Sequence, residues 1–359
     1  MMNHPKLSHF TGCLLGGAVG DALGAPIERL NIDMIRDLFG LYGIQGYVFH
    51  KKHGRFTDDT QMTLFTAEGL LRAITKYESK NLSEEQLVPI VHQAYLRWLE
   101  TQDENVNEAK TIRQSAPTGW LIREQPLHVR RGPGSTCLSA LRSGKVGRVA
   151  QPINKSMGCG GVMRVAPVGL IYHFDAEKAF DVGCWTAAIT HGHPDGFLPA
   201  GLQASIISLT LQGYGLSESI EKAVSILIQR KGHESTLKGV EIAVDMFERN
   251  CAPIPENVEI LGGGFVGTEA LSISIFCALT AFGSYRQGVL AAVNHSGDCD
   301  STASITGSIL GAALGLDAIP PEWRNRLYLD NIVLRIAEDL SKVEERHVLS
   351  DWDLLYPPC

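Results

Sequence analysis

The chain has 359 residues, of which 44% are hydrophobic and 20% charged, and its formal net charge is -7. This composition allows a large globular core, and the lack of any long basic block argues against nucleic acid as a partner. The N-terminus lacks the pattern of a signal peptide, and no apolar run is long enough to span a bilayer, so we expect a cytoplasmic protein without membrane contact. The short basic stretch 129–134 is interpreted as a solvated surface turn.

Apolar residues recur at helical spacing along most of the chain. The pattern predicts helices over residues 61–77, 83–101, 175–190, 198–213, 216–232, 235–250, 268–282, 285–295 and 329–343. Strand-like alternation is scarce, and residues 44–50 are the best candidate for a strand. Because repeated strand–helix alternation is absent, a doubly wound sheet is excluded and an all-α fold is predicted. We expect one domain over residues 1–359.

Two segments carry glycines at every fourth position. They are Gly16, Gly20 and Gly24 near the start, and Gly307, Gly311 and Gly315 near the end. Glycine inside a helix costs about 0.5–1 kcal/mol relative to alanine, so its repetition on one face needs a reason. The spacing predicts that another helix backbone packs closely against each segment at the centre of a bundle.

The eight cysteines are scattered, and none belongs to a C-x-x-C pair. A zinc site or a disulfide framework requires closer spacing or a small secreted chain. We therefore expect free thiols.

Carboxylates and hydroxyls gather in three places. These are Asp21 with Glu28, the stretch 57–60 (TDDT), and the stretch 298–301 (DCDS). Taken singly, the last two can be helix N-caps, which favour the same residue types. Together they supply more oxygens than caps need, and an oxygen-only set suits Mg²⁺, Mn²⁺ or Ca²⁺ rather than Zn²⁺. Two acidic clusters can hold two ions, and such pairs orient substrate oxygens and activate water.

A glycine-rich loop lies in the stretch 154–164, and THGHPDG follows at 190–196. Backbone N–H groups of such loops bind phosphates, although glycines also make turns for many other reasons. A histidine such as His191, taken by itself, is more often a satisfied polar core residue than a catalyst. Metal-binding oxygens beside a phosphate-binding loop indicate a phosphorylated sugar or nucleotide as the substrate.

Five motifs in the same order resemble the ADP-ribosylglycohydrolase family, which includes dinitrogenase reductase-activating glycohydrolases and ADP-ribosylarginine hydrolases. They read GCLLGGAVGDALGAPIE, FTDDTQMTL, GCGGVMRVAPVGL, THGHPDG and NHSGDCDSTASITGSILGA, and they extend from about residue 12 to residue 315. The resemblance implies a compact orthogonal bundle of helices with a central dinuclear Mg²⁺ or Mn²⁺ site. It agrees with the fold class that the periodicity predicts independently.

The resemblance also implies roles for individual residues. The matched metal ligands are Thr57, Asp58, Asp59, Asp298, Asp300 and Ser301, and the matched catalytic carboxylates are Glu28, Asp59 and Asp300. The matched substrate-binding residues, which hold the diphosphate and its ribose, are Ser156, Met157, Gly158, Cys159, Gly160, Gly161 and His191.

Four positions depart from the family pattern. Ser301 keeps the hydroxyl of the more usual threonine, and Cys159 stands where some members have asparagine. In the loop 261–271, Phe265 and Thr268 replace the expected tryptophan and glutamate, so this loop does not define the leaving group.

The expected activity is metal-dependent hydrolysis of ADP-ribose from a modified protein side chain, with ADP-ribosylarginine as the first choice. The partners are then an ADP-ribosylated protein and the product ADP-ribose. Two alternatives stay open: an immunity protein that neutralises an ADP-ribosylating toxin by hydrolysis or by direct binding, and a hydrolase of another conjugate such as O-acetyl-ADP-ribose or ADP-ribosylserine. A protein that kept the fold but lost turnover is disfavoured by the full ligand set. Every version of the metal site requires Asp59 and Asp300 to approach one another.

Overall fold

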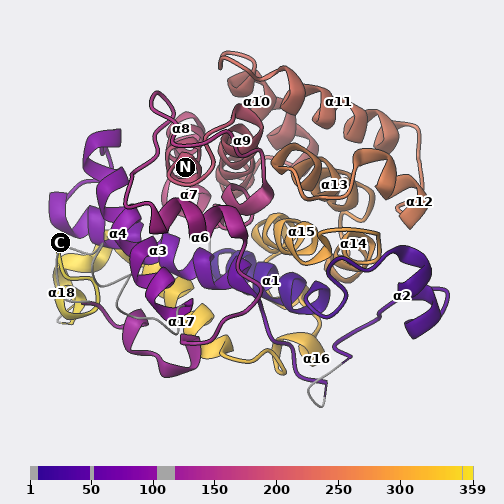
Figure 1. The fold of residues 1–359 in the computed structure, drawn as a ribbon, viewed down its shortest axis with the longest axis horizontal. Coiled ribbons are helices and arrows are strands. Elements are labelled where there is room, and N and C mark those ends of the chain that lie inside the picture. Colours follow the sequence, from indigo (N-terminus) through magenta and orange to yellow (C-terminus); the bar gives the residue numbers. More distant parts are fainter. Residues whose placement is uncertain (1–6, 49–51, 103–117, 350, 359) are drawn as a thin grey trace.

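The computed structural model describes residues 7–48, 52–102, 118–349 and 351–358, and helices dominate it (Figure 1). No residue in these ranges belongs to a β-strand, and the isolated bridges found there join Gly54 to Leu327 and Gly158 to Val266. The predicted all-α class is therefore confirmed.

The α-helices are α1 (Leu7–Gly24), α2 (Ile32–Phe39), α3 (Asp58–Tyr77), α4 (Glu84–Gln102), α6 (Ser135–Arg142), α7 (Ala166–Ile171), α8 (Ala176–Ala188), α9 (Pro194–Leu211), α10 (Leu216–Leu227), α11 (Glu234–Glu248), α12 (Pro255–Val258), α13 (Gly267–Thr280), α14 (Tyr285–Val293), α15 (Cys299–Leu314), α16 (Pro321–Arg324), α17 (Asp330–Ser341) and α18 (Trp352–Leu355). Every helix that the periodicity predicts is present, with its ends within five residues of the expected ones.

Helices α1 and α15 pack against each other at the centre of the molecule and form its most extensive helix pair (Figure 1). The two glycine series face one another: a Cβ atom added to Gly12 would lie 2.5 Å from the carbonyl oxygen of Gly311. Gly16 meets Gly307 in the same way, and Gly20 meets Ala303. Since residue numbers rise along α1 as they fall along α15, the pair is antiparallel. The close helix packing predicted from the glycine spacing is confirmed, and each series is the other's partner.

The antiparallel pair places the beginning of α15 beside the end of α1. At that end, a Cβ atom on Gly24 would collide with the backbone of Asp300. Helices α9, α13 and α14 surround α15, while α3, α7 and α17 pack on α1. The surrounding helices thus hold the first residues of α15 in place. These residues lie where α1 ends and α3 begins.

Residues 44–48 are not a strand, so that prediction is wrong where the structure describes it; residues 49–50 lie outside the described ranges. The side chain of Asn294 takes both backbone groups of Ile44. Its Oδ1 accepts from the Ile44 N–H at 2.8 Å, and its Nδ2 donates to the Ile44 carbonyl at 3.0 Å. A side chain from the end of α14 therefore stands where a partner strand would be.

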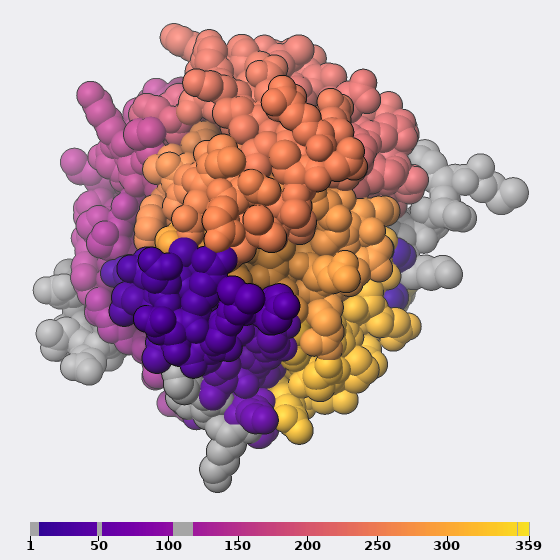
Figure 2. All heavy atoms as spheres, turned by 90° about the vertical axis from the view of Figure 1, so that its right-hand side faces the viewer, coloured from indigo at the N-terminus to yellow at the C-terminus, as the bar shows by residue number. Residues whose placement is uncertain are grey.

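Seven cysteines fall within the described residues, and all seven are free thiols; Cys359 lies outside them. No helix in the described part of the chain combines the length and apolarity that crossing a bilayer requires. On the face shown in Figure 2, the indigo N-terminal segment that includes α2 stands on the surface below the orange part of the chain.

Candidate active site

A cavity of about 200 Å³ opens at the end of the α1–α15 pair. Its lining brings together the residues Glu28, Arg29, Asp58, Asp59, Gly132, Gly134, Ser135, Thr136, Cys137, Gly158, Cys159, Gly160, Met163, His191, Phe265, Asp298, Asp300 and Ser301. Both acidic clusters predicted from sequence contribute to this one cavity, together with the glycine-rich loop and His191. Asp59 and Asp300, far apart in sequence, therefore face the same space.

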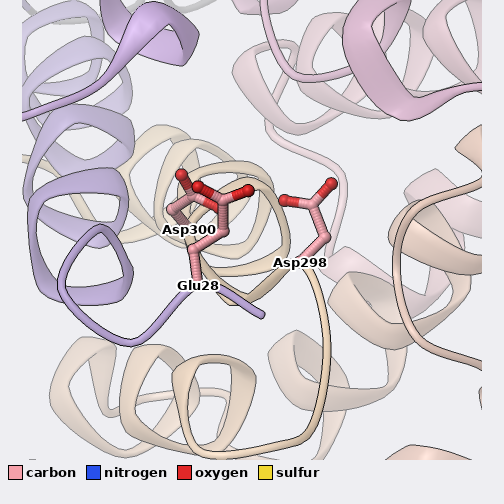
Figure 3. Close-up of side chains that lie close together, drawn as sticks. All are labelled: Glu28, Asp298 and Asp300. Carbon is pink, nitrogen blue, oxygen red and sulfur yellow. The ribbon is translucent and has the colours of Figure 1, made fainter. Parts of the chain in front are cut away.

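Three carboxylates form the tightest group in the cavity. Glu28, Asp298 and Asp300 each offer an oxygen atom, and these oxygens all lie within 4.8 Å of one another (Figure 3). Glu28 comes from the turn after α1, and the two aspartates come from the start of α15. A cation could bind to all three at once, because one oxygen from each carboxylate can reach a common point.

Asp58 and Asp59 enter the cavity from the first turn of α3. The N-cap of α3 is Thr57, whose hydroxyl accepts from the N–H of Asp59 at 3.3 Å. Asp58 accepts from the N–H of Gly134 at 3.1 Å. In contrast, Oδ2 of Asp59 is buried and has no hydrogen-bond partner among the described residues. A buried carboxylate oxygen without a donor is costly, and a bound cation would satisfy it.

Burial raises the pKa of Asp58, Asp59 and Asp300 well above the ordinary carboxyl value. Repulsion between neighbouring carboxylates raises these pKa values further, and the charge of Asp59 contributes to the shift of Asp300. These directions apply to the protein without a metal ion. A divalent cation would reverse the balance, since it stabilises the ionised carboxylates that surround it.

The helix-cap alternative explains the first acidic cluster in part and the second poorly. Thr57 caps α3, but Asp298, at the N-cap position of α15, makes no capping hydrogen bond with its side chain. Asp300 accepts from the N–H of its neighbour Ser301 at 3.0 Å, in the first turn of α15. The Asp298 carboxylate is therefore not used as a cap, and both carboxylates line the cavity.

Asp21 supports the site from behind, a role that the sequence did not reveal. Its side chain is fully buried and accepts from the N–H of Thr57 at 2.8 Å, the N–H of Thr60 at 3.0 Å and the Thr60 hydroxyl at 2.5 Å. Burial raises the pKa of Asp21 to about 6, against these hydrogen bonds, which lower it. Asp21 in α1 thus fixes the first turn of α3, from which Asp58 and Asp59 project.

We predict that Asp21→Ala lowers the free energy of unfolding by about 3 kcal/mol, because two buried backbone N–H groups lose their acceptor. Asp175→Ala is the control: Asp175 is an N-cap on α8 that accepts from the N–H of Lys178 at 2.9 Å, and its loss should cost about 1 kcal/mol. Urea denaturation of both variants measures the difference. Equal losses in the two variants would show that Asp21 is no more than an ordinary cap.

The Cys159 thiol lies against the second acidic cluster. Its Sγ donates to Oδ2 of Asp298 at 2.9 Å and lies 3.8 Å from the Ser301 hydroxyl. Burial, followed by the charge of Asp298, raises the pKa of this thiol well above its usual value. The thiol is engaged with Asp298, and the carboxylates and hydroxyls that line the cavity form a set of hard oxygens beside it.

The glycine-rich loop is joined to a second loop rather than standing alone. The N–H of Cys159 donates to the Phe265 carbonyl at 3.0 Å, and the N–H of Gly267 donates to the Met157 carbonyl at 2.8 Å. The N–H of Gly158 is 3.3 Å from the Ser156 hydroxyl. The N–H groups of Gly158 and Cys159 are therefore engaged within the protein in this structure.

Four of the predicted site residues do not line the cavity. Thr57 caps α3, and Ser156 supports the loop through its contacts with Gly158 and Thr136. Met157 is 39% exposed, and Gly161 packs against Ala187 and the Gly196 carbonyl. His191 does line the cavity, although its side chain is almost fully buried.

The turn 129–134 was interpreted as plain surface, and this was wrong for part of it. The N–H of Asp58 donates to the Arg131 carbonyl at 2.9 Å, while Gly134 donates to the Asp58 carboxylate, so the turn pairs with the start of α3. Arg29, Met163 and the residues 135–137 also line the cavity without having been predicted. Met163 stands within the motif GCGGVMRVAPVGL and Arg29 follows Glu28, whereas only the pairing of distant segments brings residues 135–137 to the cavity.

The chain was compared with known proteins. A sequence model of the ADP-ribosylglycohydrolase family matches residues 2–348. An uncharacterized protein of Archaeoglobus fulgidus is 28% identical over 338 residues, which cover 92% of this chain and 96% of the relative. ADP-ribosylhydrolase ARH3 of Homo sapiens is 25% identical over 364 residues, covering 89% of each chain. ADP-ribosylarginine hydrolase Tri1 of Pseudomonas putida is 23% identical over 340 residues, covering 93% of this chain and 78% of the relative.

Among solved structures, a chain described as an ADP-ribosylglycohydrolase-related protein complex superimposes with a TM-score of 0.62. The match covers 94% of this chain and 98% of the other at 21% identity, and it shows a shared fold. The family match spans nearly the whole sequence, and the motifs that prompted the resemblance converge on one cavity. The chain therefore belongs to the ADP-ribosylglycohydrolase family of hydrolases.

Proposed function

We propose that the protein removes ADP-ribose from a modified protein side chain, with ADP-ribosylarginine as the preferred substrate and two Mg²⁺ or Mn²⁺ ions as cofactors. One observation carries the proposal: a buried, oxygen-only group of carboxylates, including the unpartnered Oδ2 of Asp59, faces one cavity together with the glycine-rich loop and His191.

The donor set fits a hard divalent cation in number and in kind. The residues that would hold the ions are Asp58, Asp59, Asp298, Asp300 and Ser301, which line the cavity, and the tight group around Asp298 and Asp300 also includes Glu28. The resemblance adds Thr57, which caps α3 next to Asp58 and does not itself line the cavity. When bound, such ions would orient substrate oxygens and activate water for attack.

The carboxylates of the chain itself would stabilise the reacting sugar. Cleavage at an anomeric carbon builds positive charge on the ring, and nearby carboxylates lower the energy of that state. Glu28 is only partly buried, and it accepts from Nε of the exposed Arg29 at 2.8 Å. Glu28 is therefore positioned at the open side of the group, where it can accept a proton from the attacking water.

The choice of an arginine linkage rests on the similarity to Tri1, an ADP-ribosylarginine hydrolase, while the ARH3 relatives match at similar identity. The test is a panel of ADP-ribosylarginine, ADP-ribosylserine and O-acetyl-ADP-ribose, with release of ADP-ribose measured for each. We expect the arginine conjugate to be hydrolysed fastest. Faster release from either of the others would reassign the substrate, and no release from any would overturn the proposed function.

We predict that exhaustive chelation abolishes turnover and that Mg²⁺ or Mn²⁺ restores it, because the ligands are hard oxygens. Independently of activity, metal at 100 times its Kd should raise the free energy of unfolding by about 2.7 kcal/mol. Thermal unfolding with and without metal measures this. Full turnover in the chelated protein would rule out the metal site.

The metal effect should also depend on pH, with a sign set by the raised pKa values of Asp58, Asp59 and Asp300. In the metal-free protein these groups favour folding while protonated. That contribution is complete below about pH 4, the ordinary carboxyl range, and is lost as the pH rises through the raised folded-state values. The stabilisation by Mg²⁺ should therefore be larger at pH 8 than at pH 5. Thermal unfolding with and without Mg²⁺ at both pH values measures this difference. An equal rise in Tm at pH 5 and pH 8 would contradict the raised pKa values of these buried carboxylates.

A further inference from the structure

The last residue of the glycine-rich stretch 154–164 is a buried arginine. Arg164 is 1% exposed, and its guanidinium stacks over the ring of Tyr95, with Cζ 4.2 Å from the ring centroid. Its Nη2 donates to the Thr190 hydroxyl at 2.7 Å and to the Thr186 carbonyl at 3.3 Å. No carboxylate within the described ranges forms an ion pair with it. Burying an unpaired guanidinium is expensive, so its retention in this place calls for a function beyond packing.

The hydroxyl of Thr190 links Arg164 to His191, which lines the cavity. Oγ1 of Thr190 is fully buried, accepts from Arg164 and lies 2.8 Å from Nδ1 of His191. The guanidinium can only donate, so the single hydroxyl proton of Thr190 is left to be donated in turn. Nδ1 of His191 is the acceptor that the described structure offers it. This arrangement favours Nδ1 as the acceptor nitrogen of the ring, and a neutral ring then carries its proton on Nε2.

Burial favours the neutral form of the ring. Burial, with the charge of Arg164 as a second cause, lowers the pKa of His191 to about 3. Nε2 lies on the loop side of the ring: a Cβ atom on Gly158 would be 3.3 Å from it, and one on Gly160 would be 3.0 Å away. His191 borders the cavity, and no acceptor for Nε2 is present among the residues that the structure describes. One N–H donor is thus left without a protein partner at the loop.

We propose that Arg164 and Thr190 are positioning residues that hold His191 as a neutral Nε2–H donor for an anionic phosphate oxygen of the bound ADP-ribose group. This assignment of the ligand rests on the proposed function. The orientation of the proton does not, because it follows from the hydrogen bonds of the free protein. A neutral donor of this kind needs no titration at physiological pH, and the guanidinium behind it adds a positive potential without touching the ligand.

The orientation is tested by ¹⁵N NMR of the full-length protein with labelled histidine, at pH 7. His191 is assigned by the signals that disappear in His191→Gln. We expect a protonated, pyrrole-type Nε2 and an unprotonated, pyridine-type Nδ1. Thr190→Val should lose this preference, and Thr190→Ser, which keeps the hydroxyl, should retain it. A wild-type ring protonated on Nδ1 or on both nitrogens, or an unchanged ring in Thr190→Val, would overturn the proposal.

The ligand is tested by calorimetric binding of ADP-ribose to the same variants. We expect Thr190→Val and His191→Gln to bind at least about tenfold more weakly, since each loses a hydrogen bond to a charged group, and Thr190→Ser to bind as the wild type does. If Thr190→Val and His191→Gln both bind ADP-ribose with wild-type affinity, His191 does not donate to the ligand and that part of the proposal is overturned. If wild-type protein binds no ADP-ribose at all, the proposed function fails and with it the ligand, whereas the NMR result decides the proton position by itself.

Discussion

Replacing Asp300 by asparagine should reduce the release of ADP-ribose by at least about 100-fold, the upper end of the loss seen for residues that only support a metal ligand. Asp300 is 4% exposed and belongs to the group of three carboxylates whose oxygens lie within 4.8 Å of one another. Asparagine keeps the oxygen that accepts from the Ser301 N–H, but it removes the negative charge on which a cation depends. Asp298→Asn should have the same effect.

The stability of the metal-free protein separates this explanation from a structural one. The pKa of Asp300 is raised by burial and by the charges of Asp298 and Asp59, so its ionised form is unfavourable in the empty site. Asp300→Asn should therefore leave the metal-free free energy of unfolding within about 1 kcal/mol of the wild type, or raise it. The additional stability that Mg²⁺ gives to the wild type should disappear in the variant.

Asp175→Asn is the matched control, because Asp175 is a true N-cap at the start of α8 and lies outside the cavity. Asparagine is as good a cap as aspartate, so neither turnover nor stability should change. Wild-type turnover in Asp300→Asn would show that hydrolysis does not require the charge of Asp300 and that this residue merely lies at the start of a helix. Loss of turnover together with collapse of the metal-free protein would contradict the claim that the charge serves a cation rather than the fold.

The sequence predicted the helices well because periodicity records which face of each helix is buried. It located their ends less well, since ends depend on distant partners. The helix predicted over 61–77 begins at Asp58, and the reason lies in α1: Asp21 accepts from the N–H groups of Thr57 and Thr60. The failed strand at 44–48 has the same cause, because Asn294 is 250 residues away from Ile44.

The candidate site was predictable to the extent that its residues stand in motifs. The two aspartate clusters, the loop and His191 carry local patterns, and the structure gathers them around one cavity. The turn 129–134 carries no such pattern, and composition alone made it appear as surface. Its place at the cavity follows from two hydrogen bonds to Asp58, and long-range pairing of this kind cannot be inferred from neighbours in sequence.

Replacing Gly20 by alanine should destabilise the protein by about 3 kcal/mol, the upper end of the usual cost of overpacking. The new methyl group would overlap the Ala303 carbonyl oxygen, and it would lie 2.5 Å from the carbonyl carbon and 2.9 Å from the N of Ser304. All three are backbone atoms of α15, so no side chain can move aside. Gly215→Ala is the control, because a Cβ atom there meets nothing within 4 Å and φ is -63°. Urea denaturation compares the two, and a loss below about 0.5 kcal/mol in Gly20→Ala would contradict the close packing of α1 and α15.

An alanine in the contact between α1 and α15 should affect turnover only where it lies close to the cavity. Gly12 meets Gly311 and the backbone of Gly315 and Leu316, far along α15 from the cavity, whereas Gly24 meets the backbone of Asp300 itself. Alanine at either position should lower stability, because both collisions are with backbone. Only Gly24→Ala should lower turnover at a temperature where the variant is still fully folded, because it displaces a carboxylate that the proposed cations require. Equal turnover in folded Gly12→Ala and Gly24→Ala would show that the glycine packing holds the bundle together without positioning Asp300.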